Sequence, residues 1–197
     1  GINAQILHDA GTGVARYASN VVRALARIQS RHALTVFSGA GGLADELGHS
    51  TFSRTSSWVD TAARRILWEQ LVLPFKTGYH DVDVMYYPDH TAPLCLKSAK
   101  TVLTIHDLAP LAVPQTHSWR RRTYKSSTIR RSVARADKIV AVSTSTYREC
   151  LRYFDEDPDK FIVIHGAADP SVKRTTDKKQ LSSVRNRFGL SKAFVLY

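Results

Sequence analysis

The sequence contains few cysteines and no long hydrophobic run. Its 197 residues include only Cys95 and Cys150, which form no CxxC pair, so we expect neither a disulfide-stabilised scaffold nor a zinc or dithiol redox site. No apolar segment approaches the roughly 20 residues that a transmembrane helix needs. These absences lead us to expect a soluble protein of a reducing compartment, the cytoplasm.

Acidic residues are also scarce relative to basic ones. Lys and Arg number 28 and Asp and Glu 17, which gives a formal net charge of +11. A charge excess of this size favours an anionic partner or surface. Hydrophobic residues make up 43% of the chain, which is enough for a buried core, so a wholly disordered chain is excluded.

Short β-branched segments alternate with longer segments of helical period. The segments 139–142 and 161–164 are apolar throughout, as expected for strands that helices cover on both faces. The alternation predicts an α/β fold with a Rossmann-like, doubly wound parallel sheet, in which ligands bind beyond the carboxyl ends of the strands. We expect strands at residues 1–5, 34–38, 82–87, 101–106, 138–143, 161–165 and 193–197.

Apolar stripes of helical period lie between these strands. One stripe covers residues 14–28, and a second covers 66–73 and stops at Pro74. A third covers residues 181–188 and stops at Gly189. Each stripe predicts a helix with one buried face.

The end of the sequence suggests a domain division. Residues 173–180 are polar and are typical of a linker. The expected strand at 193–197 has no partner in sequence, and a lone strand cannot bury itself. We therefore expect one domain over residues 1–172, with the linker and the start of a second domain over 173–197.

A glycine-rich turn follows the first expected strand. Gly11, Thr12 and Gly13 open directly into a helix that carries Arg16. Glycines let the backbone approach a ligand, and the unpaired N–H groups of a helix start bind phosphate. A plain turn with Thr12 as helix cap explains the same residues, and the spacing is neither GxGxxG nor a Walker loop.

Polar residues mark the ends of two further strands. His106 and Asp107 lie where open sheets bind their ligands, and a histidine can donate or accept a proton near neutral pH. His90 ends the preceding strand and could line the same crevice. The alternatives are a surface turn in which Asp107 caps the following residues and a polar turn at His90.

A run of hydroxyl side chains enters the helix after residues 138–143. It consists of Ser143, Thr144, Ser145 and Thr146. Helix capping explains this run, and a hydroxyl-lined edge that faces a ligand is the alternative.

The positive charge concentrates in one predicted helix. Residues 108–136 contain no acidic residue and seven cations. Five of these cations share one broad helical face: Arg120, Arg121, Lys125, Arg131 and Arg135. A solvated face is the simplest interpretation, and an anionic membrane surface is an alternative. Since no nucleic-acid motif or interleaved aromatic residue accompanies them, no nucleic-acid partner is expected.

Four motifs occur in a fixed order along the chain. They are TGVARY at 12–17, TIHDLAPL at 104–111, ADKIVAVS at 136–143 and KFIVIH at 160–165. Together they resemble the amino-terminal half of a GT-B glycosyltransferase of the large retaining family 4. The family usually has a glycine shortly before an Asp-Pro pair, and here the glycine is displaced, in the sequence GAADP at 166–170. This departure affects the expected crossover loop rather than the fold.

The resemblance implies an enzyme that transfers a sugar from a nucleotide-sugar donor to a glycan or lipid-linked acceptor with retention. It implies no cofactor and no required metal, and a transferred hexose such as a mannosyl or rhamnosyl group. The expected setting is the assembly of bacterial surface polysaccharide, such as lipopolysaccharide or exopolysaccharide. A peripheral position at the inner face of the plasma membrane would suit the basic helix. Because the resemblance assigns the nucleotide to the carboxyl-terminal domain, we expect this chain alone to be inactive.

The resemblance also assigns roles to residues. Gly11, Thr12, Gly13 and Arg16 would form the loop near the donor diphosphate and the acceptor, and His106 would be the catalytic contact to the donor sugar. The acceptor side would be lined by His90, Asp107, Ser143, Thr144, Ser145 and Thr146. The alternative from another class is a non-enzymatic, basic Rossmann-like module that binds nucleic acid or an anionic surface.

Overall fold

The chain divides into two compact units, Gly1–Gly166 and Ala167–Tyr197. The computed structural model describes residues 1–9, 11–28, 32–38, 51–54, 61–79, 81–94, 99–112, 119–169 and 172–190. The domain division expected at residues 172 and 173 stays a prediction.

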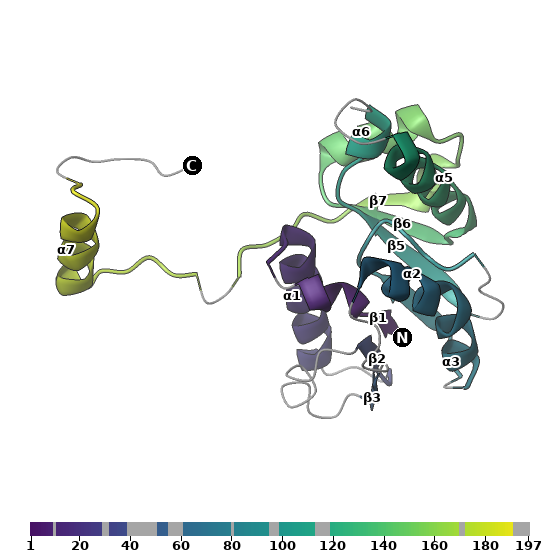
Figure 1. Cartoon of the computed structure of the whole chain (residues 1–197), viewed down its shortest axis with the longest axis horizontal. Helices are drawn as coiled ribbons and strands as arrows, with labels where there is room; N and C mark the ends of the chain where they lie inside the picture. Colours follow the sequence, from purple (N-terminus) through teal and green to yellow (C-terminus); the bar gives the residue numbers. More distant parts are fainter. Residues whose placement is uncertain are drawn as a thin grey trace. The chain divides into compact units, whose positions relative to one another are not determined.

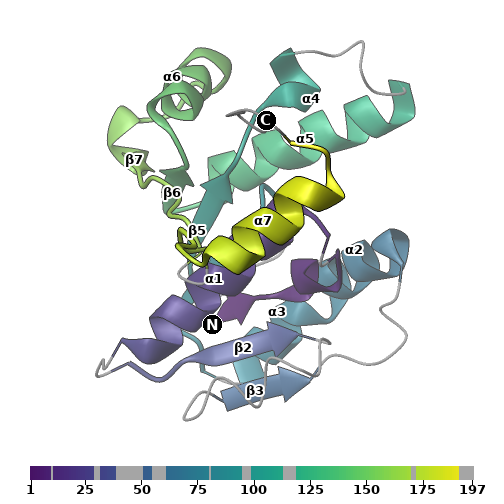
Figure 2. The same cartoon turned by 90° about the vertical axis from the view of Figure 1, so that its left-hand side faces the viewer.

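The first unit is built on a seven-stranded sheet in which every neighbouring pair is parallel (Figures 1 and 2). Its order is β3-β2-β1-β4-β5-β6-β7. The strands are β1 (Ile2–Asn3), β2 (Thr35–Ser38), β3 (Thr51–Arg54), β4 (Val84–Tyr87), β5 (Lys100–Ile105), β6 (Lys138–Ala141) and β7 (Phe161–Val163). The chain winds outward from β1 in one direction and then from β4 in the other. The switch in winding direction between β1 and β4 is where such sheets bind ligands at their carboxyl edge.

Helices cover both faces of this sheet, which confirms the predicted doubly wound α/β fold. Figure 1 shows α1 (Gly13–Arg27) on one face and α2 (Ala62–Leu71), α3 (Leu73–Tyr79) and α5 (Trp119–Arg135) on the other. The remaining helical segments of this unit are η1 (Gln5–Asp9), α4 (Ala109–Ala112), α6 (Thr144–Tyr153) and η4 (Pro158–Lys160).

The core has two parts, one on each side of the central strands. Under α1 lies a small cluster in which Ile2, Val22 and Val36 are buried. A larger cluster joins the opposite side of the sheet to the other helices through buried side chains such as Trp68 and Ile129. Because this side buries most of the large apolar residues, it fixes α2 and α5 against the central strands.

Two details differ from the sequence-based expectation. Strand β3 was not predicted, because Thr51–Arg54 is short and lacks an apolar run. The helix predicted to stop at Pro74 is α2, which ends slightly earlier, at Leu71, and Pro74 lies in the first turn of the next helix, α3, where its missing N–H leaves no hydrogen bond unmade. The expected strand at 193–197 lies outside the described residues.

The second unit contains helix α7 (Lys178–Arg187), as predicted. Asp177 caps its start by accepting hydrogen bonds from the N–H groups of Lys179 at 2.8 Å and Gln180 at 3.3 Å. The helix ends before Gly189, whose φ of +62° is the left-handed conformation that glycine adopts at helix ends. No residue of α7 is buried.

Candidate functional site

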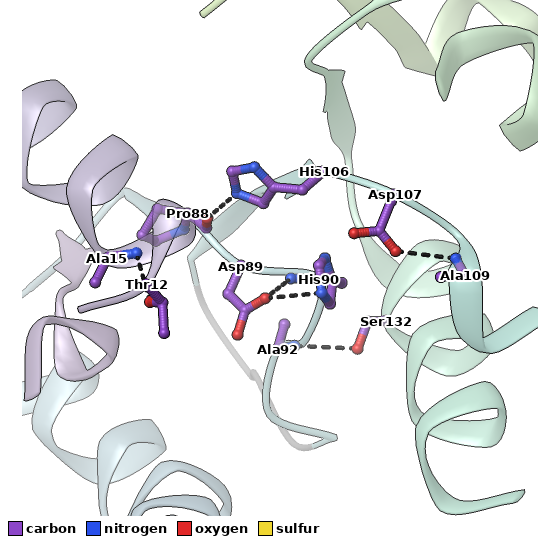
Figure 3. Close-up of polar contacts among 10 residues, drawn as sticks. All are labelled: Thr12, Ala15, Pro88, Asp89, His90, Ala92, His106, Asp107, Ala109 and Ser132. Atoms are coloured by element: carbon purple, nitrogen blue, oxygen red, sulfur yellow. Dashed lines mark hydrogen bonds and ion pairs between the residues drawn. The ribbon is translucent and has the colours of Figure 1, made fainter. Parts of the chain in front are cut away.

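The carboxyl ends of β1, β4, β5 and β6 bring four polar segments to one edge of the sheet. Figure 3 shows the residues that follow β4 and β5 beside the start of α1. Since β1 and β4 flank the change in winding direction, this edge is the expected ligand site of the fold.

The start of α1 is open to solvent. Thr12 caps the helix, because its side-chain oxygen accepts a hydrogen bond of 3.2 Å from the N–H of Ala15. A Cβ added at Gly11 or at Gly13 would meet nothing within 4 Å. Arg16 is exposed one turn along the helix. The capping interpretation of Thr12 is therefore confirmed, and the uncovered helix start also has space for an anionic group.

His106 lies directly after β5 and is half-buried. Its Nε2 lies 2.8 Å from the carbonyl oxygen of Pro88, and because a carbonyl only accepts, Nε2 must carry the hydrogen. The ring packs edge-on against Tyr17 of α1, with centroids 4.8 Å apart. Burial lowers the pKa of His106, although the hydrogen bond to Pro88 acts in the opposite direction. The neutral ring therefore keeps Nδ1 as a hydrogen-bond acceptor.

His90 and Asp89 form a second polar pair at the end of β4. The Nε2 atom of His90 lies 3.2 Å from Oδ1 of Asp89, and the same oxygen accepts a hydrogen bond of 2.7 Å from the N–H of His90. The rings of His90 and His106 are 5.8 Å apart in an edge-on arrangement. The structure thus brings the two predicted histidines together.

Asp107 lies beside this group but has a local contact. Its Oδ1 accepts a hydrogen bond of 2.9 Å from the N–H of Ala109, which holds the first turn of α4. The side chain is exposed. This geometry is the capping role that the sequence left open as an alternative.

The four hydroxyl-bearing residues at the start of α6 differ in their exposure and in their hydrogen bonds. Ser143 caps the helix by accepting a hydrogen bond of 3.0 Å from the N–H of Thr146, and Thr146 is buried. The hydroxyl of Thr146 donates to the carbonyl oxygen of His106 at 3.2 Å. Thr144 and Ser145 are exposed. The start of α6 therefore fixes the backbone at His106, a link that the sequence did not reveal.

Sequence reasoning also missed a buried acid beneath the site. Glu69 of α2 accepts a hydrogen bond from the side-chain amide of Asn3, at the end of β1. Burial, together with the nearby charge of Asp89, raises the pKa of Glu69 to about 8, against the opposing effect of Arg65. A signal was present, because an acid three residues after Ile66 interrupts the apolar stripe of a predicted helix.

The basic residues of α5 do not all face solvent. Arg131 and Arg135 are exposed, whereas Lys125 is half-buried beside α2. The side chains of Arg120 and Arg121 lie outside the described residues. Among the residues that the structure describes, no group of three or more metal-ligating side chains comes together, and no helix is long and apolar enough to cross a membrane.

The doubly wound sheet with its polar carboxyl edge has the fold of one half of a GT-B glycosyltransferase. HepE from Anabaena in complex with UDP-glucose has this fold, with a TM-score of 0.61 and 15% identity over 98% of this chain and 50% of that one. A glycosyltransferase from Rickettsia africae ESF-5 is also similar, with a TM-score of 0.53 and 17% identity over 97% of this chain and 49% of that one. The chain thus spans about half the length of these solved structures.

The sequence itself assigns the family. Residues 11–172 match the model of Glycosyltransferase Family 4, and the chain belongs to this family. No curated protein sequence matches the chain.

Proposed function

We propose that this chain is the acceptor-side half of a glycosyltransferase that moves a hexosyl group from a nucleotide-sugar donor to a glycan or lipid-linked acceptor with retention. Family membership supports the class of reaction. The observation that carries the proposal is the clustering of His106, His90 and Asp89 beside the open start of α1. The further proposal of a role in bacterial surface polysaccharide assembly, without a required metal, follows from the same family resemblance.

Each part of the cluster has a chemical task in this reaction. The leaving nucleoside diphosphate gains negative charge as the glycosidic bond breaks, and the N–H groups at the start of α1 can stabilise it. His106 cannot use Nε2 toward a substrate, since that atom is held by Pro88. Its Nδ1 can accept a hydrogen bond from a hydroxyl of the donor sugar and so orient it.

The solved relative from Anabaena indicates the donor class. That protein is described in complex with UDP-glucose and also with UDP and glucose. We therefore propose a nucleoside diphosphate hexose as the donor of the full-length protein. Ser143 and Thr146 act on this reaction indirectly, by fixing the backbone at His106.

Two substitutions of His106 test the role of each ring nitrogen. His106→Gln places an amide N–H near the position of Nε2 and preserves the contact to Pro88, but it removes the acceptor at Nδ1. His106→Asn places an amide oxygen near Nδ1 and loses the contact to Pro88. If Nδ1 binds the donor sugar, His106→Gln should lower kcat of the full-length protein at least tenfold, while His106→Asn retains more activity and less thermal stability. Equal activity of the two variants, or losses that follow the folded fraction, would show that His106 is only structural.

A further inference from the structure

A pocket of about 300 Å³ lies beside the histidine pair, between α2, the loop after β4, and α5. We call it the α2–α5 pocket. Glu69, Asp89 and Thr91 line it and also line a smaller adjoining hollow that reaches Asn3 and Tyr87. Its volume is at the lower end of the roughly 300–1,000 Å³ typical of small-molecule sites.

The walls of the α2–α5 pocket are held in place by hydrogen bonds. The N–H of Ala92 donates to the hydroxyl of Ser132 on α5 at 3.0 Å (Figure 3). The N–H of Leu94 donates to the side-chain oxygen of Gln70 on α2 at 2.9 Å. These two hydrogen bonds fix the loop after β4 to both helices, so the walls of the pocket have a defined geometry.

Two buried polar atoms at this pocket lack a partner among the described residues. They are Nδ1 of His90, which lines the pocket itself, and the hydroxyl of Tyr87, which lines the adjoining hollow. Buried polar groups nearly always have a hydrogen-bond partner, and each exception needs an explanation. A bound molecule with several hydroxyl groups would supply partners to both, because a hydroxyl donates and accepts.

The remaining lining has the mixed character of a carbohydrate site. Ile66 is half-buried and offers an apolar surface that suits the C–H face of a sugar ring, and the buried Ile129 also lines the pocket. Asp89 supplies hydrogen-bond acceptors, and Lys125 of α5 supplies donors. Arg65 and Lys125 also line the pocket, but the carboxylate of Asp89 repels a phosphate group, whereas it accepts a hydrogen bond from a hydroxyl, so the side of the pocket at Asp89 favours an uncharged ligand.

We propose that the α2–α5 pocket binds one uncharged pyranose ring of the acceptor saccharide, with Asp89 accepting hydrogen bonds from its hydroxyls and Ile66 against its C–H surface. The identity of this ring as the acceptor rests on the proposed function. The pocket adjoins the histidine pair through His90, so a ring bound there lies next to the donor-sugar contact at His106. The acceptor is then a saccharide, either free or carried by a lipid, rather than a bare lipid phosphate.

Binding to the 197-residue chain tests this proposal without any transfer reaction. Methyl α-mannopyranoside, methyl α-glucopyranoside and inorganic phosphate serve as probes, and the methyl resonances of Ile66 and Ile129 serve as reporters. We expect saturable shifts of both isoleucines with at least one glycoside in the millimolar range, and none with phosphate. Asp89→Asn should weaken this binding at least tenfold. The matched control Asp83→Asn, at the opposite end of the same strand, should change it less than twofold. No saturable shift with either glycoside, a shift with phosphate alone, or equal effects of the two substitutions would overturn the proposal.

Steady-state kinetics of the full-length protein separate this proposal from the proposed function. If both are correct, Asp89→Asn raises the KM for the acceptor at least tenfold and leaves the KM for the donor within twofold. If transfer occurs but the acceptor KM is unchanged, the pocket proposal fails and the glycosyltransferase function stands. If no glycosyl transfer occurs with any acceptor, the proposed function fails, and the binding experiment alone decides whether the pocket takes a sugar.

Discussion

At the scale of single residues, the carboxyl of Glu69 is an acid buried beneath the candidate site. Asn3 donates to it, Tyr87 and Asp89 lie near it on the strand side, and Arg65 lies near it on its own helix. Burial is the largest cause of its raised pKa, since a charge in a poorly solvated position is unfavourable. The carboxyl is therefore protonated at neutral pH and can donate a hydrogen bond at the edge of the site.

Glu69 should make stability fall with rising pH. Its pKa is about 8 in the folded chain and near 4.5 when exposed, so between these values the folded state binds the extra proton. The contribution of Glu69 is complete below about pH 4.5 and is lost as pH rises toward 8, by at most about 1.4 kcal/mol per pH unit. Glu69→Gln mimics the protonated acid and should flatten this slope.

Urea unfolding of the 197-residue chain at pH 5, 6, 7 and 8 measures this effect. Glu149→Gln is a matched control, because Glu149 is only half-buried and lies on α6. We expect Glu69→Gln to be closest to the unsubstituted chain at pH 5 and to exceed it at pH 8. Parallel stability curves for the two proteins would show that Glu69 is ionised in the folded state.

The residue scale also shows how much of the site the sequence could provide. His106 and His90 were predicted as site residues because each ends a strand, and the structure places them side by side. Their roles in sugar transfer stay predictions. Tyr17 and Glu69 were not predicted, since their contacts join residues far apart in sequence, such as Glu69 and Asn3, 66 positions apart. Periodicity specifies which face a residue occupies but not which distant side chain it meets.

At the scale of elements, the start of α6 should stabilise both the helix and the backbone at His106. Ser143→Ala removes the cap and should lower the free energy of unfolding by about 1 kcal/mol, since caps contribute roughly 0.5–2 kcal/mol. Ser145→Ala is the control, because Ser145 is exposed one residue into the helix and should cost less than about 0.5 kcal/mol. Thermal unfolding followed by calorimetry compares the two. Equal losses would mean that the cap does not stabilise α6.

The positions of the strands and helix ends could be predicted only in part from the sequence. The strands β6 and β7 were predicted because 139–142 and 161–164 are apolar runs. The expected cover on both faces is wrong for β7, because it is an edge strand in which Ile162 is exposed. Strand β3 has the residues Thr51, Phe52, Ser53 and Arg54, and its pairing with β2 decides its conformation. The stop predicted at Pro74 agrees with the end of α2 at Leu71, but the new helix that begins at Leu73 was not predicted, although proline is suited to a first helical turn.

Helix α5 carries the prediction of a membrane surface. Its exposed Arg131 and Arg135 add to the net charge of +11, and each basic residue near an anionic bilayer contributes about 1 kcal/mol. We expect the chain to float with vesicles that contain anionic lipid, less so at high salt, and not with neutral vesicles. The double substitution of Arg131 and Arg135 by Gln should reduce the bound fraction much more than the double substitution of Lys178 and Lys179, which removes the same charge from α7. Equal recovery on neutral and anionic vesicles would contradict the prediction that α5 binds an anionic membrane surface.

At the scale of the whole molecule, the chain has a core but spans about half the length of the solved structures that it matches. Side chains such as Trp68 and Tyr87 are buried between the sheet and its helices, so the first unit should fold cooperatively. Transfer between two substrates also requires that both be held in one geometry, and such positioning can supply roughly 7–11 kcal/mol of the barrier. Under the proposed function this chain provides mainly the acceptor side and by itself lacks this contribution.

We therefore expect the isolated 197 residues to show one cooperative thermal transition for the first unit and no glycosyl transfer. Their affinity for UDP-glucose should be millimolar at best, because the open start of α1 offers backbone N–H groups for a diphosphate, while the proposed function assigns the base of the nucleotide to the carboxyl-terminal domain. Isothermal calorimetry with UDP-glucose, with the full-length protein as the positive control, measures this directly. A ligand at 100 times its dissociation constant raises stability by about 2.7 kcal/mol, so a thermal shift with the full-length protein and none with these residues is the expected pair of results. Micromolar, saturable binding of UDP-glucose to the isolated chain would instead place donor recognition on the sheet edge that carries His106.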